Sequence, residues 1–87
     1  MTRETLLEFP TPFPIKALGR DEPGFRQLVT ELIAVHAVFD PNDDVKEQGS
    51  SKGNFISVTV TLQAESQQQL DTIYQCLHDH EQILMVF

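Results

Sequence analysis

The sequence has little of several features on which functional assignments often rest. It contains no tryptophan, one cysteine (Cys76), and only six lysine and arginine residues against thirteen aspartate and glutamate residues. A lone cysteine excludes an internal disulfide, so we expect a reducing, cytoplasmic environment. The formal net charge of −7 opposes binding to phosphate backbones and anionic lipids, which predicts no nucleic-acid and no membrane partner. No apolar run has the length of a signal peptide or a membrane span.

The chain length sets the scale of the fold. Eighty-seven residues, 40% of them hydrophobic, suit one small domain with a limited core. We therefore expect residues 1–87 to form a single domain. Within it, residues 1–12 are expected to be an extended lead-in segment, because prolines recur there at alternate positions, and residues 13–87 to be the core.

Apolar periodicity predicts six elements in the core. Strands are predicted over residues 13–19, 45–48, 56–62 and 82–87, and helices within residues 21–39 and 66–80. Ser66 is expected to cap the second helix. The strand over 45–48 is too polar for the middle of a sheet and is expected at an edge.

This order of elements predicts an α+β, ferredoxin-like βαββαβ fold. Two right-handed crossovers close such a chain into a four-stranded antiparallel sheet with both helices on one face. The first and third strands are expected in the centre of the sheet and the second and fourth at its edges.

The segment "SSKGNFISVTV" (50–60) has the residue types of a phosphate-binding loop. Its order is wrong for that function, because Lys52 precedes Gly53 and a strand follows instead of a helix. A hairpin turn explains the segment better. Its tip still offers polar groups for an anionic partner or a small carboxylate ligand, and the predicted binding residues are Ser50, Ser51, Lys52, Asn54 and Lys16.

Three stretches resemble a known family. "LLEFPTPFPIKALG" (6–19), "SSKGNFISVTV" (50–60) and the terminal "MVF" resemble the YbeD family of small bacterial proteins. The resemblance covers nearly the whole chain and implies a fold similar to that of ACT regulatory domains. It also implies a regulatory protein that binds lipoic acid, through the association of the family with lipoate metabolism. The family has no established catalytic residues, so the resemblance implies neither an enzyme nor a cofactor.

An enzymatic alternative comes from "GRDEPGFR", which partly resembles the loop that holds phosphate in acylphosphatases of the same fold. In this chain Asp21 and Glu22 would repel a phosphate dianion, and Pro23 removes one amide donor. Arg26 and Asn54 alone do not make a mechanism. We therefore predict a non-enzymatic protein, with an acylphosphatase-like hydrolase as the alternative and with no catalytic residues.

Two further functions are weighed and not adopted. Cys76 and His80 lie four residues apart on the second helix, but zinc requires three or four convergent ligands, so no metal site is predicted. RNA-binding proteins of this architecture stack bases on aromatic residues of the central strands. Phe55 is one such platform, and the negative net charge opposes this use.

The last strand carries the strongest signal for an interaction surface. It is apolar in both registers, so one set of its side chains is expected to remain on the open face of the sheet. We predict a patch of Leu18, Leu84 and Val86, which suits a protein partner or a homodimer through the open sheet face. The sequence thus predicts a small non-enzymatic regulatory or ligand- or protein-binding module.

Overall fold

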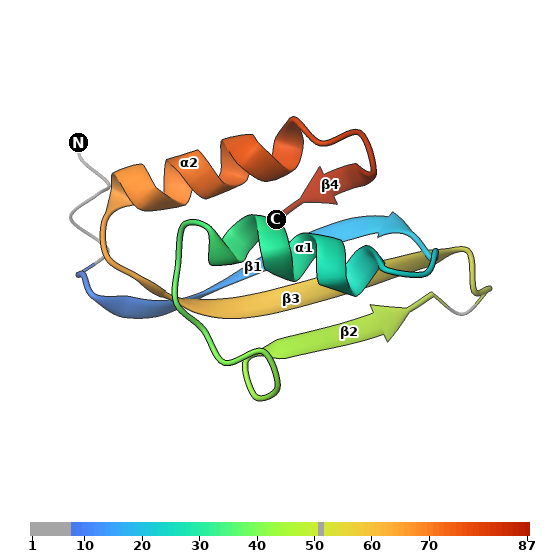
Figure 1. The fold of residues 1–87 in the computed structure, drawn as a ribbon, viewed down its shortest axis with the longest axis horizontal. Coiled ribbons are helices and arrows are strands. Elements are labelled where there is room, and N and C mark those ends of the chain that lie inside the picture. The colour runs from blue at the N-terminus through green and yellow to red at the C-terminus, as the bar shows by residue number, and fades with distance from the viewer. Residues whose placement is uncertain (1–7, 51) are drawn as a thin grey trace.

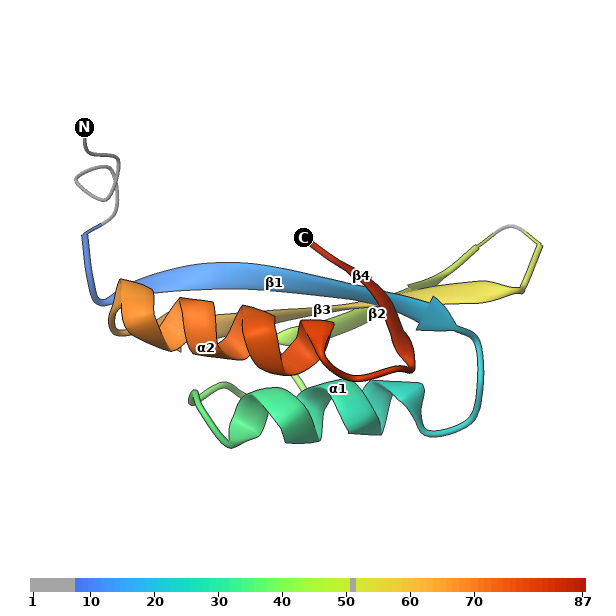
Figure 2. The ribbon, with the colours of Figure 1, turned by 90° about the horizontal axis from the view of Figure 1, so that it is seen from above.

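The computed structural model describes residues 8–50 and 52–87 and has the predicted order of elements (Figure 1). In chain order the elements are β1 (Thr11–Arg20), α1 (Phe25–Ala34), β2 (Val45–Gly49), β3 (Phe55–Ala64), α2 (Gln67–His78) and β4 (Ile83–Val86). The four strands form one antiparallel sheet in the order β2-β3-β1-β4. Both helices lie on the same side of it (Figure 2). The predicted ferredoxin-like fold, with β2 and β4 at the edges, is confirmed.

The central strands are longer than predicted. β1 and β3 pair continuously from Thr11 opposite Ala64 to Arg20 opposite Phe55. Residues 11 and 12, expected in the lead-in segment, therefore belong to β1. The alternation of apolar residues misses this extension, because prolines interrupt the pattern at the start of the strand.

β1 is a central strand that contains prolines, which normally lie at sheet edges. Lys16 exchanges both backbone hydrogen bonds with Phe87, at 3.0 and 2.8 Å, so the even-numbered residues of β1 direct their backbone groups toward β4. Pro12 and Pro14 share this direction, but β4 pairs only with the carboxyl-terminal half of β1. The missing N–H groups of the two prolines therefore leave no hydrogen bond unmade, because no strand of the described chain lies beside them on that side of β1 to accept one.

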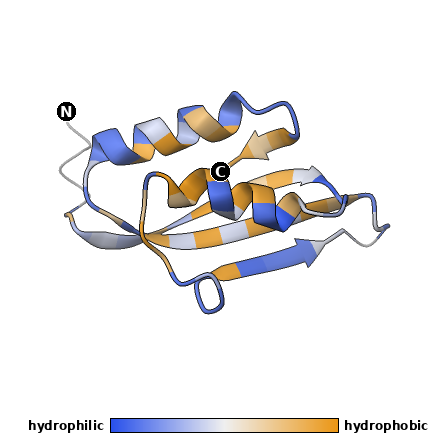
Figure 3. Cartoon of the chain, in the orientation of Figure 1, coloured by the Kyte–Doolittle hydropathy of each residue, from blue (hydrophilic) through white to orange (hydrophobic). Residues whose placement is uncertain are grey.

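The core lies between the sheet and the two helices. Its strand residues are the inward-facing ones of β1 and β3 together with Val45 of β2 and Ile83 of β4, and its helix residues form one stripe on each helix (Figure 3). The fully buried large side chains are those of Ile15, Ile33, Leu62, Leu70, Ile73, Leu77, Val29, Val58 and Val60. The edge strands differ, since β2 is hydrophilic after Val45 whereas β4 is apolar (Figure 3).

Gly19 is required where α1 meets the sheet. A Cβ atom at this position would overlap the ring of Phe25 and would lie 2.8 Å from the carbonyl oxygen of Gln82. The absent side chain therefore lets the first aromatic residue of α1 pack directly on the central strand, where it is buried.

The two helices begin differently. α2 has the predicted cap, because the backbone N–H of Gln69 donates to Ser66 Oγ at 3.1 Å. α1 begins only after the predicted acids and Pro23, at a left-handed Gly24 (φ 87°) with no side-chain cap. α1 ends at Ala34, so His36 lies just beyond the helix, half-buried at the edge of the core.

Within residues 8–50 and 52–87, no helix is both long enough and apolar enough to cross a membrane.

Candidate functional site

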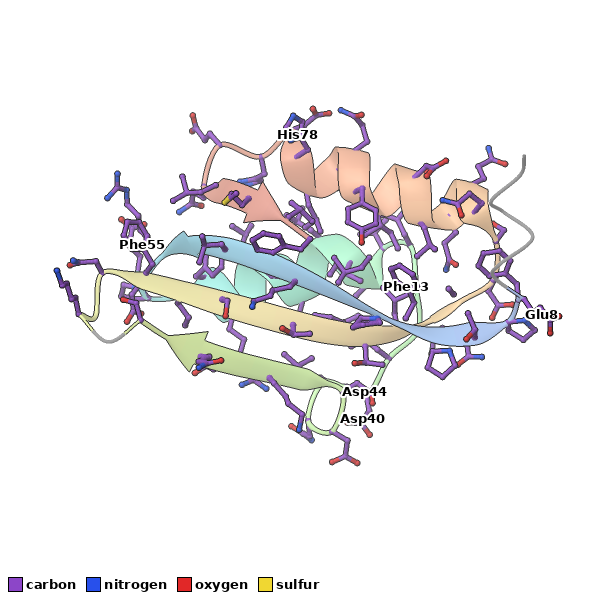
Figure 4. The ribbon with its side chains drawn as sticks, turned by 180° about the vertical axis from the view of Figure 1, so that it is seen from behind. Glu8, Phe13, Asp40, Asp44, Phe55 and His78 are labelled. Carbon is purple, nitrogen blue, oxygen red and sulfur yellow. The ribbon has the colours of Figure 1, made fainter. Side chains whose placement is uncertain are left out.

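The side of the sheet away from the helices is not covered by any described segment (Figures 2 and 4). We call it the open face. Because side chains alternate along a strand, the pairing register assigns every other residue of each strand to it. These residues are Pro12, Pro14, Lys16, Leu18 and Arg20 of β1, Lys46 and Gln48 of β2, and Phe55, Ser57, Thr59, Thr61 and Gln63 of β3.

A β-bulge changes what β4 contributes to this face. Val86 pairs with Ala17 and Met85 with Leu18, whereas Gly19 pairs with Ile83, so the register shifts at Leu84. Neither predicted register of β4 is correct, because the bulge brings both Ile83 and Val86 toward the helices. The placement of Val86 on the open face is therefore wrong.

The apolar patch has a different composition from the predicted one. Met85 and Phe87 take the open-face positions beside β1 and are 53% and 54% exposed. Leu18 is half-buried between them and β3, and Leu84, in the bulge, is 47% exposed. The patch thus keeps Leu18 and Leu84 of the prediction and gains two residues that the sequence pattern left undecided.

Basic residues gather on the open face around this patch. Lys16 and Lys46 both pair with Thr59, so a row of Lys46, Thr59 and Lys16 crosses β2, β3 and β1 and ends at Phe87, the residue after β4. With strands about 4.8 Å apart, the Cα atoms of the two lysines are about 10 Å apart. Both lysines and Thr59, with Glu47, Gln48 and Ser57, line a hollow of about 330 Å³.

Two of these cations stack against aromatic rings. Lys16 Nζ lies 5.6 Å from the centre of the Phe87 ring, and the Arg20 guanidinium lies 5.9 Å from the centre of the Phe55 ring. Phe55 is at the end of the open face where β3 begins (Figure 4). These contacts hold the cations against the sheet and fix where they present positive charge.

The acidic residues are elsewhere in the described chain. No strand position on the open face carries Asp or Glu, and Glu47, which pairs with Val58, is directed to the helix side. Asp40 and Asp44 lie in the loop before β2 (Figure 4), where the backbone N–H of Asp40 donates to Asp44 Oδ2 at 2.8 Å. The charged side chains at the strand positions of the open face are therefore all positive, although the net charge of the chain is −7.

The predicted hairpin site is divided by the structure. Ser50 closes the turn, because its Oγ accepts a hydrogen bond from the Phe55 N–H at 3.3 Å and its carbonyl accepts one from Gly53 at 3.0 Å. Lys52 is exposed at the tip, and Ser51 lies outside the described residues. Lys16 pairs with Thr59, about 16 Å along β3 from Asn54, and so does not join the hairpin.

Sequence reasoning missed Lys46 and Arg20 as site residues. Lys46 was on a strand considered only for its polarity, and Arg20 was one residue beyond the predicted end of the first strand. The alternation of side chains places both on the face of Lys16 once the strand bounds are known.

Arg26, the arginine of the acylphosphatase alternative, binds the β2 edge. Its Nη2 donates to the carbonyl oxygens of Pro41, at 3.3 Å, and Val45, at 3.5 Å, and its Nη1 lies 3.6 Å from Glu47 Oε1. These contacts tie α1 to the loop and strand at one side of the sheet. The side chain is therefore directed to structural partners.

The metal-ligand pair considered in the sequence is split by the end of α2 at His78, because Cys76 lies on the helix and His80 lies beyond it. His80 Nδ1 accepts a hydrogen bond from the Gln82 N–H at 3.3 Å. Among the residues that the structure describes, no group of three or more histidine, cysteine, aspartate or glutamate side chains is arranged to hold a metal ion.

The sequence matches a known family model over most of its length. The family is described as "Protein of unknown function (DUF493)", and the match covers residues 4–87. A UPF0250 protein of Nitrosomonas europaea is 40% identical over 86 residues, which cover 99% of each chain. A UPF0250 protein of Neisseria gonorrhoeae is 39% identical over 84 residues, covering 97% of this chain and 92% of the relative.

Two solved structures share the fold. The solution structure of protein HP0495 from H. pylori has a TM-score of 0.73 at 12% identity, covering 93% of this chain and 85% of the other. The ACT domain from the GTP pyrophosphokinase of Chlorobium tepidum has a TM-score of 0.59 at 18% identity, covering 88% and 97%. At these identities the similarity concerns the fold alone, and that fold is ACT-like.

Proposed function

From the premise that this chain belongs to the DUF493 family of proteins of unknown function, we propose that it is a non-enzymatic module that binds an anionic protein partner on the open face of its sheet. Family membership confirms the resemblance to the YbeD family. A regulatory use of such a module is part of the proposal, as is its cytoplasmic location.

The observation that carries the proposal is the separation of charge. Of the five described lysine and arginine residues, Lys16, Arg20 and Lys46 share the open face. They lie beside exposed apolar side chains that no segment within residues 8–50 and 52–87 covers. An exposed apolar patch with a charged rim is typical of a protein-binding surface, and the sign of the rim favours an acidic partner.

The same charges favour a different partner over a second copy of this chain. In a face-to-face homodimer with twofold symmetry, each open face would meet the same face of its partner. Lys16, Arg20 and Lys46 of both copies would then share one interface, and like charges across an interface oppose association. The homodimer through the open face is therefore the weaker form of the proposal.

The hydrolase alternative has less support. Acyl-phosphate chemistry needs an arginine free to hold the phosphate, and Arg26 instead contacts Pro41, Val45 and Glu47. Moving it to a substrate would cost these contacts at the β2 edge.

A lipoate-related ligand also fits the surface in outline. Its carboxylate matches Lys16, and its apolar chain matches Leu18 and the ring of Phe87. A sheet face encloses a small molecule poorly, whereas most small-ligand sites bury the larger part of their ligand. We therefore propose a macromolecular partner and retain lipoate as a competing probe.

The experiment is a footprint by nuclear magnetic resonance. The ¹⁵N-labelled protein is titrated separately with hexaglutamate and with lipoate, and amide shifts are recorded. We expect hexaglutamate to shift Lys16, Lys46 and Thr59 selectively, with the effect decreasing as salt is raised. Shifts concentrated on α1 or α2, or no shifts at millimolar peptide, would reject the proposal. Saturable shifts with lipoate alone would favour the small ligand.

A further inference from the structure

Resting on the proposed function, we infer that the partner presents an acidic amphipathic α-helix, which lies on the open face as a third layer. The inference concerns the shape and side-chain pattern of the partner segment. It follows from the backbone, the apolar patch and the spacing of the cations on this face.

The paired backbone of the sheet favours a helix over an extended peptide on the open face. Within the sheet, β3 and the carboxyl-terminal half of β1 have their backbone groups paired with neighbouring strands, so the face around Leu18 offers side chains only. An extended peptide laid there would lose water from its own N–H and C=O groups and would find no backbone partners. A helix satisfies these groups internally. The opposite face of this sheet is already covered by two helices (Figure 2).

The apolar patch gives such a helix a place to pack. Leu18, Met85 and Phe87 form one continuous corner of the open face where β1 meets β4, and Leu84 extends it at the bulge. Toward β2 the face changes to Thr59, Ser57 and Gln48. The surface is therefore apolar on one side and polar on the other, which matches a helix with one apolar stripe.

The cations set the positions of the acidic residues. Lys16 and Arg20 lie on either side of Leu18 along β1, about 13 Å apart at their Cα atoms. Two turns of helix cover about 11 Å. Acidic residues one turn before and one turn after a central apolar residue would then reach both cations, and a third on the polar flank would reach Lys46.

The test uses three peptides of about 16 residues, of which the first two have the same composition of leucine, glutamate and alanine. The first has leucines at helical spacing, the second has them alternating as in a strand, and the third is the first with proline at its two central positions. Affinity is measured by calorimetry, and helix content by circular dichroism. We expect the helical peptide to bind at least tenfold more tightly than the other two and to gain helicity on binding.

Variants of the protein locate the contact. Leu18→Ser should weaken the helical peptide at least fivefold. Thr61→Ser, further along the same face, should leave its affinity within twofold. Thermal melts check that both variants remain folded, and Met85→Ser replaces Leu18→Ser if the first variant unfolds.

The outcomes separate the two proposals. Equal binding of all three peptides would overturn the helix and leave the anionic partner standing. Failure of every peptide at millimolar concentration would overturn both. A single-stranded uridine octanucleotide serves as the competing class. Tighter binding of this probe through Phe55 and Phe87 would replace the protein partner with a nucleic acid.

Discussion

The two faces of the sheet are built from alternate residues of the same strands, and their chemistry is opposite. Ile15 and Val58 point to the helices and are fully buried, while their neighbours Lys16 and Thr59 point to the open face. One face supplies the core that stabilises the fold, and the other carries charge that the fold does not need. Residues that stabilise the fold and residues available for binding therefore alternate along the same strands, so that one set can be changed without the other.

The largest difference in stability between the two faces is expected from truncating two adjacent residues of β3. Leu62 is 1% exposed on the helix face, so Leu62→Ala should lower the free energy of unfolding by about 2–5 kcal/mol. Thr61 points to the open face, and Thr61→Ala should change it by less than about 1 kcal/mol. Urea denaturation measures both. Equal losses for the two variants would mean that the faces are not distinct.

A substitution at Gly19 tests how closely the helix layer packs on the sheet. Gly19→Ala should destabilise the protein by about 1–3 kcal/mol, because the added methyl group overlaps the ring of Phe25. The double variant Gly19→Ala with Phe25→Leu should lose less unfolding free energy than the sum of the losses of the two single variants. Additive losses in thermal denaturation would indicate that the two positions are not in contact.

Removing the side-chain cap of α2, in the same helix layer, should lower the stability of the protein by a smaller amount. Ser66→Ala removes the acceptor for the Gln69 N–H and should lower stability by about 1 kcal/mol. The exposed Thr72→Ala on the same helix is the control and should be close to neutral. Neither change touches the open face, so affinity for an acidic peptide should be the same for both. A loss of affinity in either variant would connect the two faces.

The smallest expected effect on stability comes from Asp40 in the loop before β2, and it depends on pH. Hydrogen bonds from the backbone N–H groups of Asp43 and Asn42 hold the pKa of Asp40 below its usual range. Since the folded pKa is the lower one, the contribution to stability is present above about pH 4 and is lost as pH falls through the folded pKa. Asp40→Asn should therefore differ from the wild type more at pH 6 than at pH 2.5 in urea denaturation. A difference that grows on acidification would contradict this assignment.

Much of the fold could be predicted from the sequence. The alternation in β3 and the apolar stripes of both helices were each compatible with only one secondary structure and one buried side, and Ser66 marked the start of α2. The sequence of β4 does not determine its buried side, because it is apolar at every position and its orientation depends on a bulge in its pairing with β1. A local pattern cannot contain that information.

The candidate site was less accessible to sequence reasoning. Lys16 and Leu18 were identified, since they alternate with buried residues in a recognisable strand. Lys46 and Phe87 join them only through contacts between strands distant in the sequence, and Arg20 joins them because β1 extends one residue beyond its predicted end. The net charge of −7 also concealed a local excess of positive charge, because composition averages over both faces.

On this proposal the open face, and not the acidic remainder of the surface, binds the partner. The decisive measurement is calorimetry of the acidic helical peptide against two double variants that lower the net charge equally. Lys16→Gln with Lys46→Gln alters the open face, and Gln68→Glu with Thr72→Glu alters the exposed side of α2. With about 0.5–1 kcal/mol for each exposed ion pair, the first should weaken binding about fivefold to thirtyfold and the second less than twofold. Equal weakening by both variants would contradict the account.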